Sequence, residues 1–343
     1  MSTPFRIDVH HHFLPPVYAK GEFQALQYEH LHEASTHISF TTVALQKNGG
    51  DPSGWKTPSW SIENDEAICQ KLEIRTAFLS ITAPGPDVVK GPESARIARE
   101  CNEWAAELRD QDPQKYGFFA TIPSPFENIN QAISEVAYAL DVLHADGVTL
   151  FTRYGDANYY LGHPMFKPLW AELNSREAVV FIHPTTGVDI GMINPLLPAP
   201  MIEYPHETTR CAVDLIVSGR IRENSDCKII LCHSGGTLPF IATRPGVLLS
   251  HANLSSMTHE EFLGDARRFY YEIAQSSSLA IECLMKFADP DRILYGCDYP
   301  YCPEKTIDFF KNALNSAPLT EDQLSKINTT NALKLFPRLT KGN

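Results

Sequence analysis

The sequence lacks the charge pattern of a nucleic-acid-binding protein and the long apolar run of a membrane protein. Lysine and arginine total 29 against 41 aspartate and glutamate residues, which gives a formal net charge of −12. A nucleic-acid surface would need clustered basic residues instead. No segment approaches the ~18 consecutive apolar residues of a membrane span, and the first residues lack the apolar core of a signal peptide. We therefore expect neither a nucleic acid nor a membrane as a partner.

The eight cysteines lack both a C-x-x-C pair and the spacing of a small disulfide framework. Several lie in or beside apolar segments, namely Cys211, Cys227, Cys232, Cys283 and Cys297. Free cysteines are among the most frequently buried residues, so these side chains are expected to be buried thiols. The pattern predicts a reducing, cytoplasmic location.

What the sequence does have is a regular alternation of short apolar runs and helical patterns. Eight runs predict β-strands, at residues 5–9, 75–81, 117–122, 147–151, 178–183, 228–233, 269–273 and 292–297. Some are apolar almost throughout, as in parallel strands covered on both faces. Helical patterns fall between them, for example at residues 93–110, 129–144, 165–176, 207–222 and 277–287. This alternation predicts an α/β fold in which residues 1–343 form a single (β/α)8 TIM-barrel domain.

Residues 14–64 interrupt the alternation between the first strand and the next βα unit. The segment is rich in proline, glycine, histidine and aromatic residues, and residues 47–60 have the composition of an irregular loop. An insertion after the first strand of a barrel lies on the face where active sites form, so we expect a lid or a pocket wall. A plain surface excursion is the alternative. The last residues, 338–343, are expected to form a frayed end.

Three consecutive histidines follow the first predicted strand, within the motif Asp8-Val-His-His-His-Phe13. Side chains alternate along a strand, so His10 and His12 face one side and His11 faces the other. Two imidazoles that point into the mouth of a barrel can bind one metal ion. A remnant of a histidine tag is the alternative, although a tag would not continue a strand pattern that ends in Phe-Leu-Pro-Pro.

Three further predicted strands end in a histidine or an aspartate. His183 ends the run at residues 178–183, His233 ends the run at 228–233, and Asp298 follows the run at 292–297. A barrel places its catalytic groups at these strand ends. Nitrogen and oxygen donors of this kind suit zinc or manganese. Together the four strand ends predict a metal site at the barrel mouth.

These motifs resemble those of the amidohydrolase superfamily and, within it, of the aminocarboxymuconate-semialdehyde decarboxylase family. The likeness covers nearly the whole chain, from residue 7 to about residue 335. It rests on four pieces of sequence: Asp8-Val-His-x-His-Phe, Phe181-Ile-His-Pro, Cys232-His-Ser-Gly-Gly and Gly296-Cys-Asp-Tyr-Pro. The resemblance implies an amidohydrolase-type barrel that acts on a small carboxylic acid.

The same resemblance implies a role for each residue of the predicted metal site. His10, His12, His183 and Asp298 would bind one divalent ion, with His233 as an unliganded catalytic histidine beside it. Two-metal amidohydrolases usually bridge their ions with a carboxylated lysine at the end of strand 4. Here residues 147–153 read Gly-Val-Thr-Leu-Phe-Thr-Arg and contain no lysine. One ion is therefore expected, zinc first and manganese as the alternative, with no organic cofactor.

The reaction that the resemblance implies is decarboxylation of an ortho-hydroxybenzoate by a carboxy-lyase. Asp298 would protonate the carbon that bears the carboxyl group, and His233 would polarise or hold the substrate. A carboxylate that acts as an acid needs a raised pKa, which an anionic substrate and a closed pocket could supply. The loops at residues 50–60 and 79–85 most resemble the branch of the family that converts 6-methylsalicylate to 3-methylphenol and CO2.

Five residues are candidates for binding this small aromatic carboxylic acid. Arg244 matches an arginine that in related enzymes reaches a substrate carboxylate across a dimer interface, which implies a homodimer or a dimer of dimers. A structural salt bridge is the alternative role for it. Tyr301 falls where relatives carry an aromatic pocket residue. Phe13, Thr82 and Trp60 are expected to line the pocket, with ordinary core packing as the alternative for each.

Two other functions remain open at this point. The first is a hydrolase or hydratase of a lactone or an unsaturated acid on the same barrel, with His233 as a base on metal-bound water. The second is a barrel that binds metal only for structure, although structural sites are normally closed and four-coordinate. Elsewhere, Glu207 is expected to cap the first turn of its helix. His163, His206 and His251 are expected to be ordinary polar or packing residues.

Overall fold

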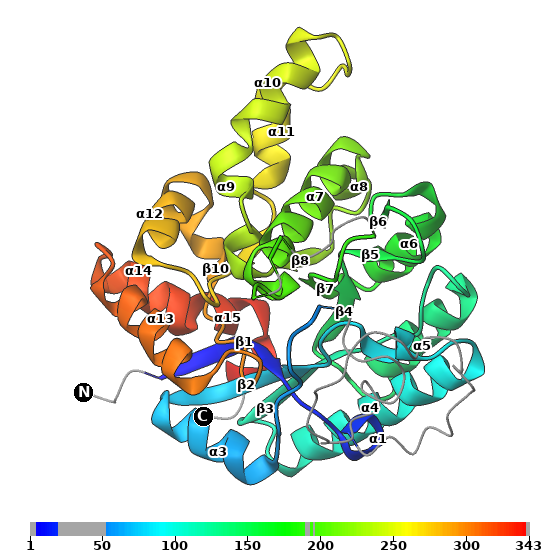
Figure 1. Ribbon diagram of the computed structural model, residues 1–343, viewed down its shortest axis with the longest axis vertical. Helices are drawn as coiled ribbons and strands as arrows, with labels where there is room; N and C mark the ends of the chain where they lie inside the picture. Colours follow the sequence, from blue (N-terminus) through cyan, green and yellow to red (C-terminus); the bar gives the residue numbers. More distant parts are fainter. Residues whose placement is uncertain (1–4, 20–52, 189–192, 195, 341–343) are drawn as a thin grey trace.

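The computed structural model describes residues 5–19, 53–188, 193–194 and 196–340, which form the predicted barrel (Figure 1). Eight strands pair in the order β1-β2-β3-β4-β7-β8-β9-β10, and every neighbouring pair is parallel. The strands are β1 (Arg6–His12), β2 (Ile74–Ser80), β3 (Tyr116–Ala120), β4 (Gly147–Phe151), β7 (Val179–His183), β8 (Lys228–Leu231), β9 (Tyr270–Glu272) and β10 (Ile293–Leu294). The predicted fold class is confirmed.

Backbone hydrogen bonds between β1 and the chain that follows β10 close the barrel. The amide of Val9 donates to the carbonyl of Tyr295 at 3.0 Å, and the amide of His12 donates to that of Tyr299 at 2.7 Å. Between them, the amide of Asp298 donates to the carbonyl of His10 at 2.8 Å. Closure therefore holds Asp298 directly beside the histidine motif.

Helices lie outside the strands and cover the barrel (Figure 1). Those of the first half of the described chain are α1 (Pro16–Ala19), α3 (Ile62–Lys71), α4 (Pro92–Gln111), α5 (Ile129–Asp141), α6 (Lys167–Ser175) and α7 (Glu203–Val217). The remainder are α8 (Arg220–Glu223), α9 (Leu238–Ile241), α10 (Thr243–His251), α11 (His259–Ala266), α12 (Ser278–Phe287), α13 (Glu304–Ser316), α14 (Glu321–Ser325) and α15 (Asn331–Leu335). No helix among the described residues is long and apolar enough to cross a membrane.

The predicted position of Glu207 at the start of its helix is wrong. Helix α7 begins at Glu203, so Glu207 lies in its second turn, where it is fully buried. Its carboxylate accepts a hydrogen bond from the hydroxyl of Tyr160 at 2.8 Å. Tyr160 belongs to a small hairpin, β5 (Arg153–Tyr154) with β6 (Tyr159–Tyr160), that the sequence pattern did not predict. Glu207 therefore ties this hairpin to α7 instead of capping a helix.

Aromatic side chains fill the interior of the barrel from Phe181, whose ring centroid lies 5.1 Å from that of His10, to Phe336. Phe119 stacks on Phe78, with ring centroids 5.4 Å apart, and on Phe181 at 5.3 Å. Phe336, just beyond α15, lies 4.0 Å from Phe78 by the same measure. Leu339 joins the same buried cluster. The C-terminal segment thus plugs the barrel.

The expectation of a frayed end from residue 338 onward is wrong for residues 338–340. The guanidinium of Arg338 pairs with the carboxylate of Asp146, one contact being 3.0 Å long, and donates to the carbonyl of Tyr116 at 3.1 Å. It also lies over the ring of Phe78. These contacts fix the last turn of the C-terminal segment to the barrel, and this keeps the apolar side chains of the segment buried. Residues 341–343 lie outside the described part of the chain.

Replacement of this arginine is expected to loosen the plug. The Arg338→Ala variant should lose about 1–3 kcal/mol of unfolding free energy, because it leaves the buried Asp146 carboxylate without its charged partner and with only the amide of Phe118 among the described residues. Chemical denaturation would measure the change. Lys167→Ala is the control, since among the described residues Lys167 has only an exposed ion pair with Glu223 at 4.0 Å, and such pairs contribute about 0–1 kcal/mol. Equal stability losses in the two variants would contradict the anchoring role.

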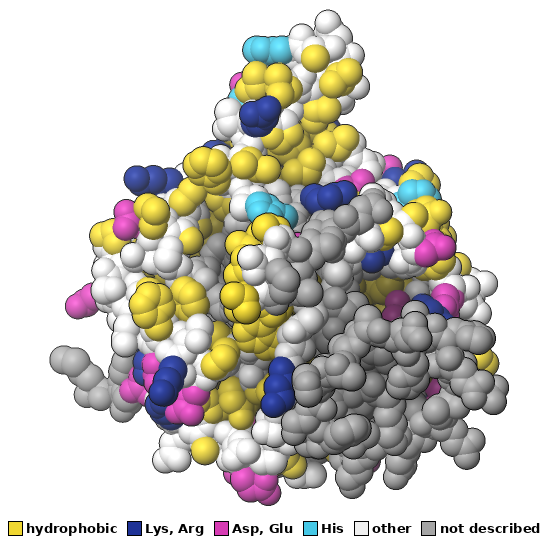
Figure 2. All heavy atoms as spheres, in the orientation of Figure 1, with side chains coloured by type: hydrophobic (Ala, Val, Ile, Leu, Met, Phe, Trp, Pro, Cys, Tyr) yellow, Lys and Arg dark blue, Asp and Glu magenta, His cyan; other side chains and the backbone are white. Residues whose placement is uncertain are grey.

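Helices α10 and α11 project from the barrel as an arm (Figure 1). The sequence pattern predicted no helix between the strands expected at 228–233 and 269–273. Large apolar side chains are exposed on α9 and along the arm: Phe240 is 84% exposed, Leu248 51% and Leu254 75%. Figure 2 shows hydrophobic side chains along the arm in the same orientation.

Of the expected insertion at residues 14–64, residues 20–52 lie outside the described part of the chain.

Candidate metal centre

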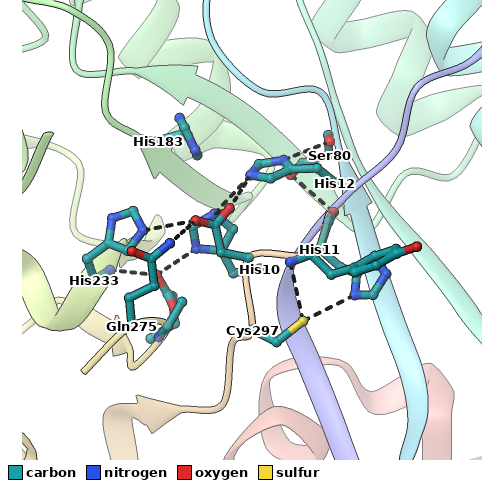
Figure 3. A network of polar contacts seen from close by, with 12 residues as sticks. His10, His11, His12, Ser80, His183, His233, Gln275 and Cys297 are labelled. Atoms are coloured by element: carbon teal, nitrogen blue, oxygen red, sulfur yellow. Dashed lines mark hydrogen bonds and ion pairs between the residues drawn. The ribbon is translucent and has the colours of Figure 1, made fainter. Parts of the chain in front are cut away.

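Four of the predicted residues converge at the mouth of the barrel (Figure 3). The Nε2 atoms of His10 and His12 are 3.0 Å apart. The Oδ1 atom of Asp298 lies 3.3 Å from the first and 3.2 Å from the second. His183, at the end of β7, completes a set in which the candidate ligand atoms all lie within 4.8 Å of one another. All four residues are buried, so the structure brings the expected ligand set together.

Each of the three imidazoles is oriented by a partner on its outer side. The partners of the Nδ1 atoms are Glu272 Oε1 for His10 at 2.8 Å, the carbonyl of Ser80 for His12 at 3.0 Å, and the carbonyl of Pro184 for His183 at 2.7 Å. An imidazole that donates from Nδ1 presents the lone pair of Nε2 on its other side. The Nε2 lone pairs of the set can then point to one common centre.

The electrostatics of the cluster suit cation binding. Burial lowers the pKa of His12 and, together with the neighbouring histidines, holds the pKa of His183 well below its ordinary value. Burial disfavours the charged form of Asp298, but His10 and His12 outweigh it and hold the pKa of this carboxyl well below its usual range. For His10, Glu272 and Asp298 outweigh burial and raise the pKa well above its ordinary value. His12 and His183 as neutral imidazoles and Asp298 as a carboxylate can bind a metal ion directly, whereas His10 must lose its proton when an ion binds.

The backbone turns sharply at the strand ends that carry the site. The φ angles of His233, Gln275 and Asp298 are 53°, 55° and 61°, in the left-handed region that non-glycine residues seldom adopt. Strand β8 ends at Leu231 and β10 at Leu294, earlier than the sequence predicts. Strained backbone of this kind clusters at functional sites. Here it turns three side chains into the same cavity.

His233 lies beside the four clustered residues. Its Nε2 atom is 3.6 Å from Oδ2 of Asp298, on the opposite side of the carboxylate from His10 and His12. Its backbone amide donates to Oε1 of Glu272 at 2.6 Å. Its Nδ1 atom is buried and has no hydrogen-bond partner among the described residues. This position matches the one that the resemblance implies for the catalytic histidine.

Glu272 and Gln275 were missed in the sequence. Glu272 is fully buried at the end of β9. Its carboxylate accepts hydrogen bonds from the His10 imidazole and from the backbone amides of His233 and Ala274. A charged residue inside an apolar predicted strand was the signal for it. Gln275 donates from Nε2 to Oδ2 of Asp298 at 2.6 Å. No motif marks this glutamine, because it enters the site only through the turn of the backbone.

A cavity opens beside the cluster. Four residues at or beside the cluster line it: His183, His233, Gln275 and Asp298. The other lining residues are Trp55, Thr82, Pro200, Met201, Tyr204 and Tyr301. No lysine or arginine occurs among these described lining residues. The cavity suits a flat, largely apolar ligand with one anionic end at the cluster.

The five candidate substrate-binding residues fall into three groups. Thr82 and Tyr301 line the cavity. Phe13 and Trp60 pack instead around Trp104, with ring centroids 5.5 and 5.6 Å from it, and are not among the residues that line the cavity. Arg244 is exposed on α10, on the projecting arm.

The end of β4 contains no lysine, as the sequence indicates. Arg153, which follows β4, donates from Nε to the carbonyl of Thr186 at 2.9 Å and from Nη1 to that of Gly155 at 2.8 Å. The candidate metal cluster contains no residue of β4.

Loss of the Gln275 hydrogen bond is expected to reduce turnover. The Gln275→Leu variant keeps the size of the side chain but leaves Oδ2 of Asp298 free to rotate. A hydrogen bond to a charged group contributes about 1.5–3 kcal/mol, so kcat should fall about 10- to 100-fold. Steady-state kinetics would measure it, with Gln131→Leu on the outer helix α5 as the unaffected control. A kcat within twofold of the wild type would contradict this role.

The fold and this site define the class of protein: a (β/α)8 barrel with three histidines and an aspartate clustered at the C-terminal ends of its strands. The chain belongs to the amidohydrolase family, whose model matches residues 7–338. It is 44% identical to the 6-methylsalicylic acid decarboxylase of Penicillium expansum over 340 residues, which cover 97% of both chains. An enzyme of the same description from Aspergillus aculeatus is also 44% identical, over 97% of this chain and 96% of its own.

Solved structures give the same picture of the fold. The structure of 2,6-dihydroxybenzoate decarboxylase complexed with 2,6-dihydroxybenzoate matches with a TM-score of 0.77 and 22% identity. The match covers 98% of this chain and 99% of the other. At this level of identity the likeness concerns the fold.

Proposed function

We propose that the protein is a metal-dependent decarboxylase of an ortho-hydroxybenzoate, with 6-methylsalicylate as substrate and 3-methylphenol and CO2 as products. The observation that carries the proposal is the cluster of His10, His12, His183 and Asp298 at the wall of a cavity without lysine or arginine among its described lining residues. The 44% identity to two 6-methylsalicylic acid decarboxylases supports the choice of substrate.

The residues present fit a single divalent ion. Their nitrogen and oxygen donors are close enough to share one centre, and the outer hydrogen bonds of the imidazoles fix the orientation that coordination needs. Zinc is the ion expected from the donor set. A structurally similar dihydroxybenzoic acid decarboxylase was solved with bound manganese, so both ions belong in any test.

The chemistry divides between the ion and the side chains. His10, His12, His183 and Asp298 would hold a divalent ion, which would supply positive charge for the anionic oxygens of the substrate. Asp298 transfers a proton to the ring carbon that bears the carboxylate. The bond between this carbon and the carboxylate then breaks, its electron pair returns to the ring, and CO2 leaves. The net change is uptake of one proton and release of one CO2.

Asp298 must receive a proton before it can transfer one. Its neighbours hold its pKa well below the usual range, whereas an acid in this role needs a raised pKa. An anionic substrate beside the carboxylate would act in that direction. His233 Nε2 lies 3.6 Å from Oδ2, beyond direct hydrogen-bond distance, so proton transfer between them would need a shorter contact in the substrate complex or one bridging water. We assign His233 this relay role.

The apolar part of the cavity lining suits the ring and its methyl group. Trp55, Pro200 and Met201 supply apolar surface, and Thr82 and Tyr301 supply hydroxyl groups. Trp55 comes from the insertion at residues 14–64, whose Ser53 carbonyl accepts the amide of Ala199 at 2.8 Å. We propose on this basis that the insertion forms part of the pocket wall of one barrel domain.

The projecting arm is proposed to form a homodimer interface. Its exposed apolar side chains resemble a surface that a partner covers. Arg244 lies on this arm, and in a dimer it could supply the positive charge that the described cavity lining lacks. All eight cysteines are free, which is consistent with the proposed reducing, cytoplasmic location.

Arg244→Ala is expected to raise KM for the aromatic acid about tenfold or more, with a smaller effect on kcat, if the arm of one subunit reaches the cavity of another. Sedimentation would show the dimer that this requires. Arg210→Ala provides a comparison, because Arg210 is a half-exposed residue bound to Glu207 on α7. An unchanged KM, or a monomer at all concentrations, would contradict the proposed interface.

The function itself is tested by incubation of metal-replete protein with a panel of hydroxybenzoates while CO2 is followed. We expect release of CO2 from 6-methylsalicylate and none from the isomer with the hydroxyl group para to the carboxyl, which cannot chelate. Failure of every salicylate-type acid would contradict the proposal. Incorporation of labelled water oxygen without CO2 would favour a hydrolase or hydratase on the same barrel.

A further inference from the structure

His11 lies between two candidate ligands in the sequence, yet its ring points to the opposite side of β1 (Figure 3). It is fully buried, and both of its ring nitrogens contact carboxylates. Nδ1 is 3.0 Å from Oδ2 of Asp8, and Nε2 is 2.9 Å from Oδ1 of Asp65. The proposed reaction uses none of these three residues, although they place an imidazole between two carboxyl groups deep in the barrel wall.

Asp8 connects this bridge to the metal cluster. Its Oδ1 atom accepts the backbone amide of His10 at 3.0 Å and the backbone amide of Cys297 at 3.1 Å. The first amide belongs to a candidate ligand, and the second to the residue that precedes Asp298. One carboxylate oxygen therefore fixes the distance between the end of β1 and the chain beyond β10. This distance determines how closely the ligand atoms of His10 and Asp298 can approach each other.

Asp65 connects the bridge to the outer layers of the barrel. It lies in α3, is fully buried, and accepts the hydroxyl of Tyr116 from β3 at 2.8 Å. It also accepts the indole N–H of Trp60 at 3.2 Å. Through this hydrogen bond Trp60 is linked to Asp65 and so to His11. Its ring also packs on that of Phe13, with centroids 6.5 Å apart. The bridge spans two strands, one helix and the end of the insertion.

We infer that His11 is a positioning residue: by joining Asp8 to Asp65 it fixes the separation of His10, His12 and Asp298 and so sets the affinity of the site for its ion. The inference rests on the proposed metal-dependent function. Partners outside the ligand set typically change metal affinity 10- to 100-fold when they are lost. A bridge that served only stability would leave the affinity of the folded protein unchanged.

The test measures metal affinity separately from stability. Competition with a chelator gives the affinity of the wild type and of His11→Gln for Mn2+ and Zn2+, and thermal unfolding gives the stability of each metal-free protein. We expect the affinity of His11→Gln to fall 10- to 100-fold, and kcat at saturating metal to fall more than KM rises. Arg338→Ala is the matched control, because it breaks another ion pair with a buried carboxylate and should lower only stability.

Affinity for both ions within twofold of the wild type in His11→Gln, with a loss of stability alone, would overturn the inference while leaving the proposed function intact. If His11→Gln does not fold, Asp65→Asn decides in its place, since it keeps the shape of the side chain and weakens the same bridge. It should lower the affinity at least threefold, and an unchanged affinity would overturn the inference. A wild-type protein that binds neither ion would overturn both proposals.

Discussion

Removal of the divalent ion with a chelator is expected to abolish CO2 release from 6-methylsalicylate, by at least about 1000-fold. The described cavity lining contains no lysine or arginine, so the ion is the main positive charge available there to the substrate carboxylate. Chelation should also lower the melting temperature, because an ion that binds only the folded state stabilises it. Activity assays and metal analysis before and after dialysis would measure both effects.

Reconstitution provides the control for this experiment. Addition of Zn2+ or Mn2+ should restore activity, and Mg2+ should restore it poorly because histidine nitrogens are unfavourable ligands for that ion. Full activity in protein shown by elemental analysis to be free of metal would contradict the account. Loss of folding without any dependence of turnover on metal would favour a structural site.

Replacement of Asp298 by asparagine is expected to lower kcat by at least about 1000-fold. Asparagine has nearly the same shape, but it cannot carry the proton to the ring carbon, and general acid catalysis typically contributes 10²- to 10⁴-fold. It is also a weaker ligand than a carboxylate. If the asparagine keeps its oxygen at the ligand position, its amide nitrogen faces Gln275 and cannot accept the hydrogen bond from that side chain.

Metal content must be measured in the same variant, so that loss of the ion is distinguished from loss of the proton donor. At saturating metal, Asp298→Asn should contain one ion per chain and remain inactive. A variant that binds the ion and keeps more than a tenth of the wild-type kcat would refute the role of Asp298 as the acid. Gln275→Leu should lie between this variant and the wild type.

Barrel strands and the residues at their ends were the features most open to prediction from the sequence. A run such as residues 179–182 is apolar throughout because helices cover one side and the barrel core covers the other. His183 and Asp298 could be identified because each is a polar residue directly after such a run, where a barrel places its catalytic groups. The ligand set then required only that three strand ends, those of β1, β7 and β10, lie at one mouth, which the closed barrel ensures.

Features that depend on tertiary contacts were not predicted. Gln275 enters the cavity only because its backbone adopts a left-handed conformation, which one sequence does not reveal. Arg338 looked like part of a loose terminus, yet Asp146, distant in sequence, fixes it. His11 was assigned to the opposite side of the strand from the ligands, as found, but the two carboxylates that flank it could be recognised only in three dimensions.

The central claim is most directly tested by analysis of the products that metal-replete protein forms from 6-methylsalicylate in D2O. The account predicts one CO2 per 3-methylphenol, with one deuterium at the ring carbon that carried the carboxyl group, as read by mass spectrometry and proton NMR. Unchanged substrate, or a product that keeps its carboxyl group and gains oxygen from water, would contradict it.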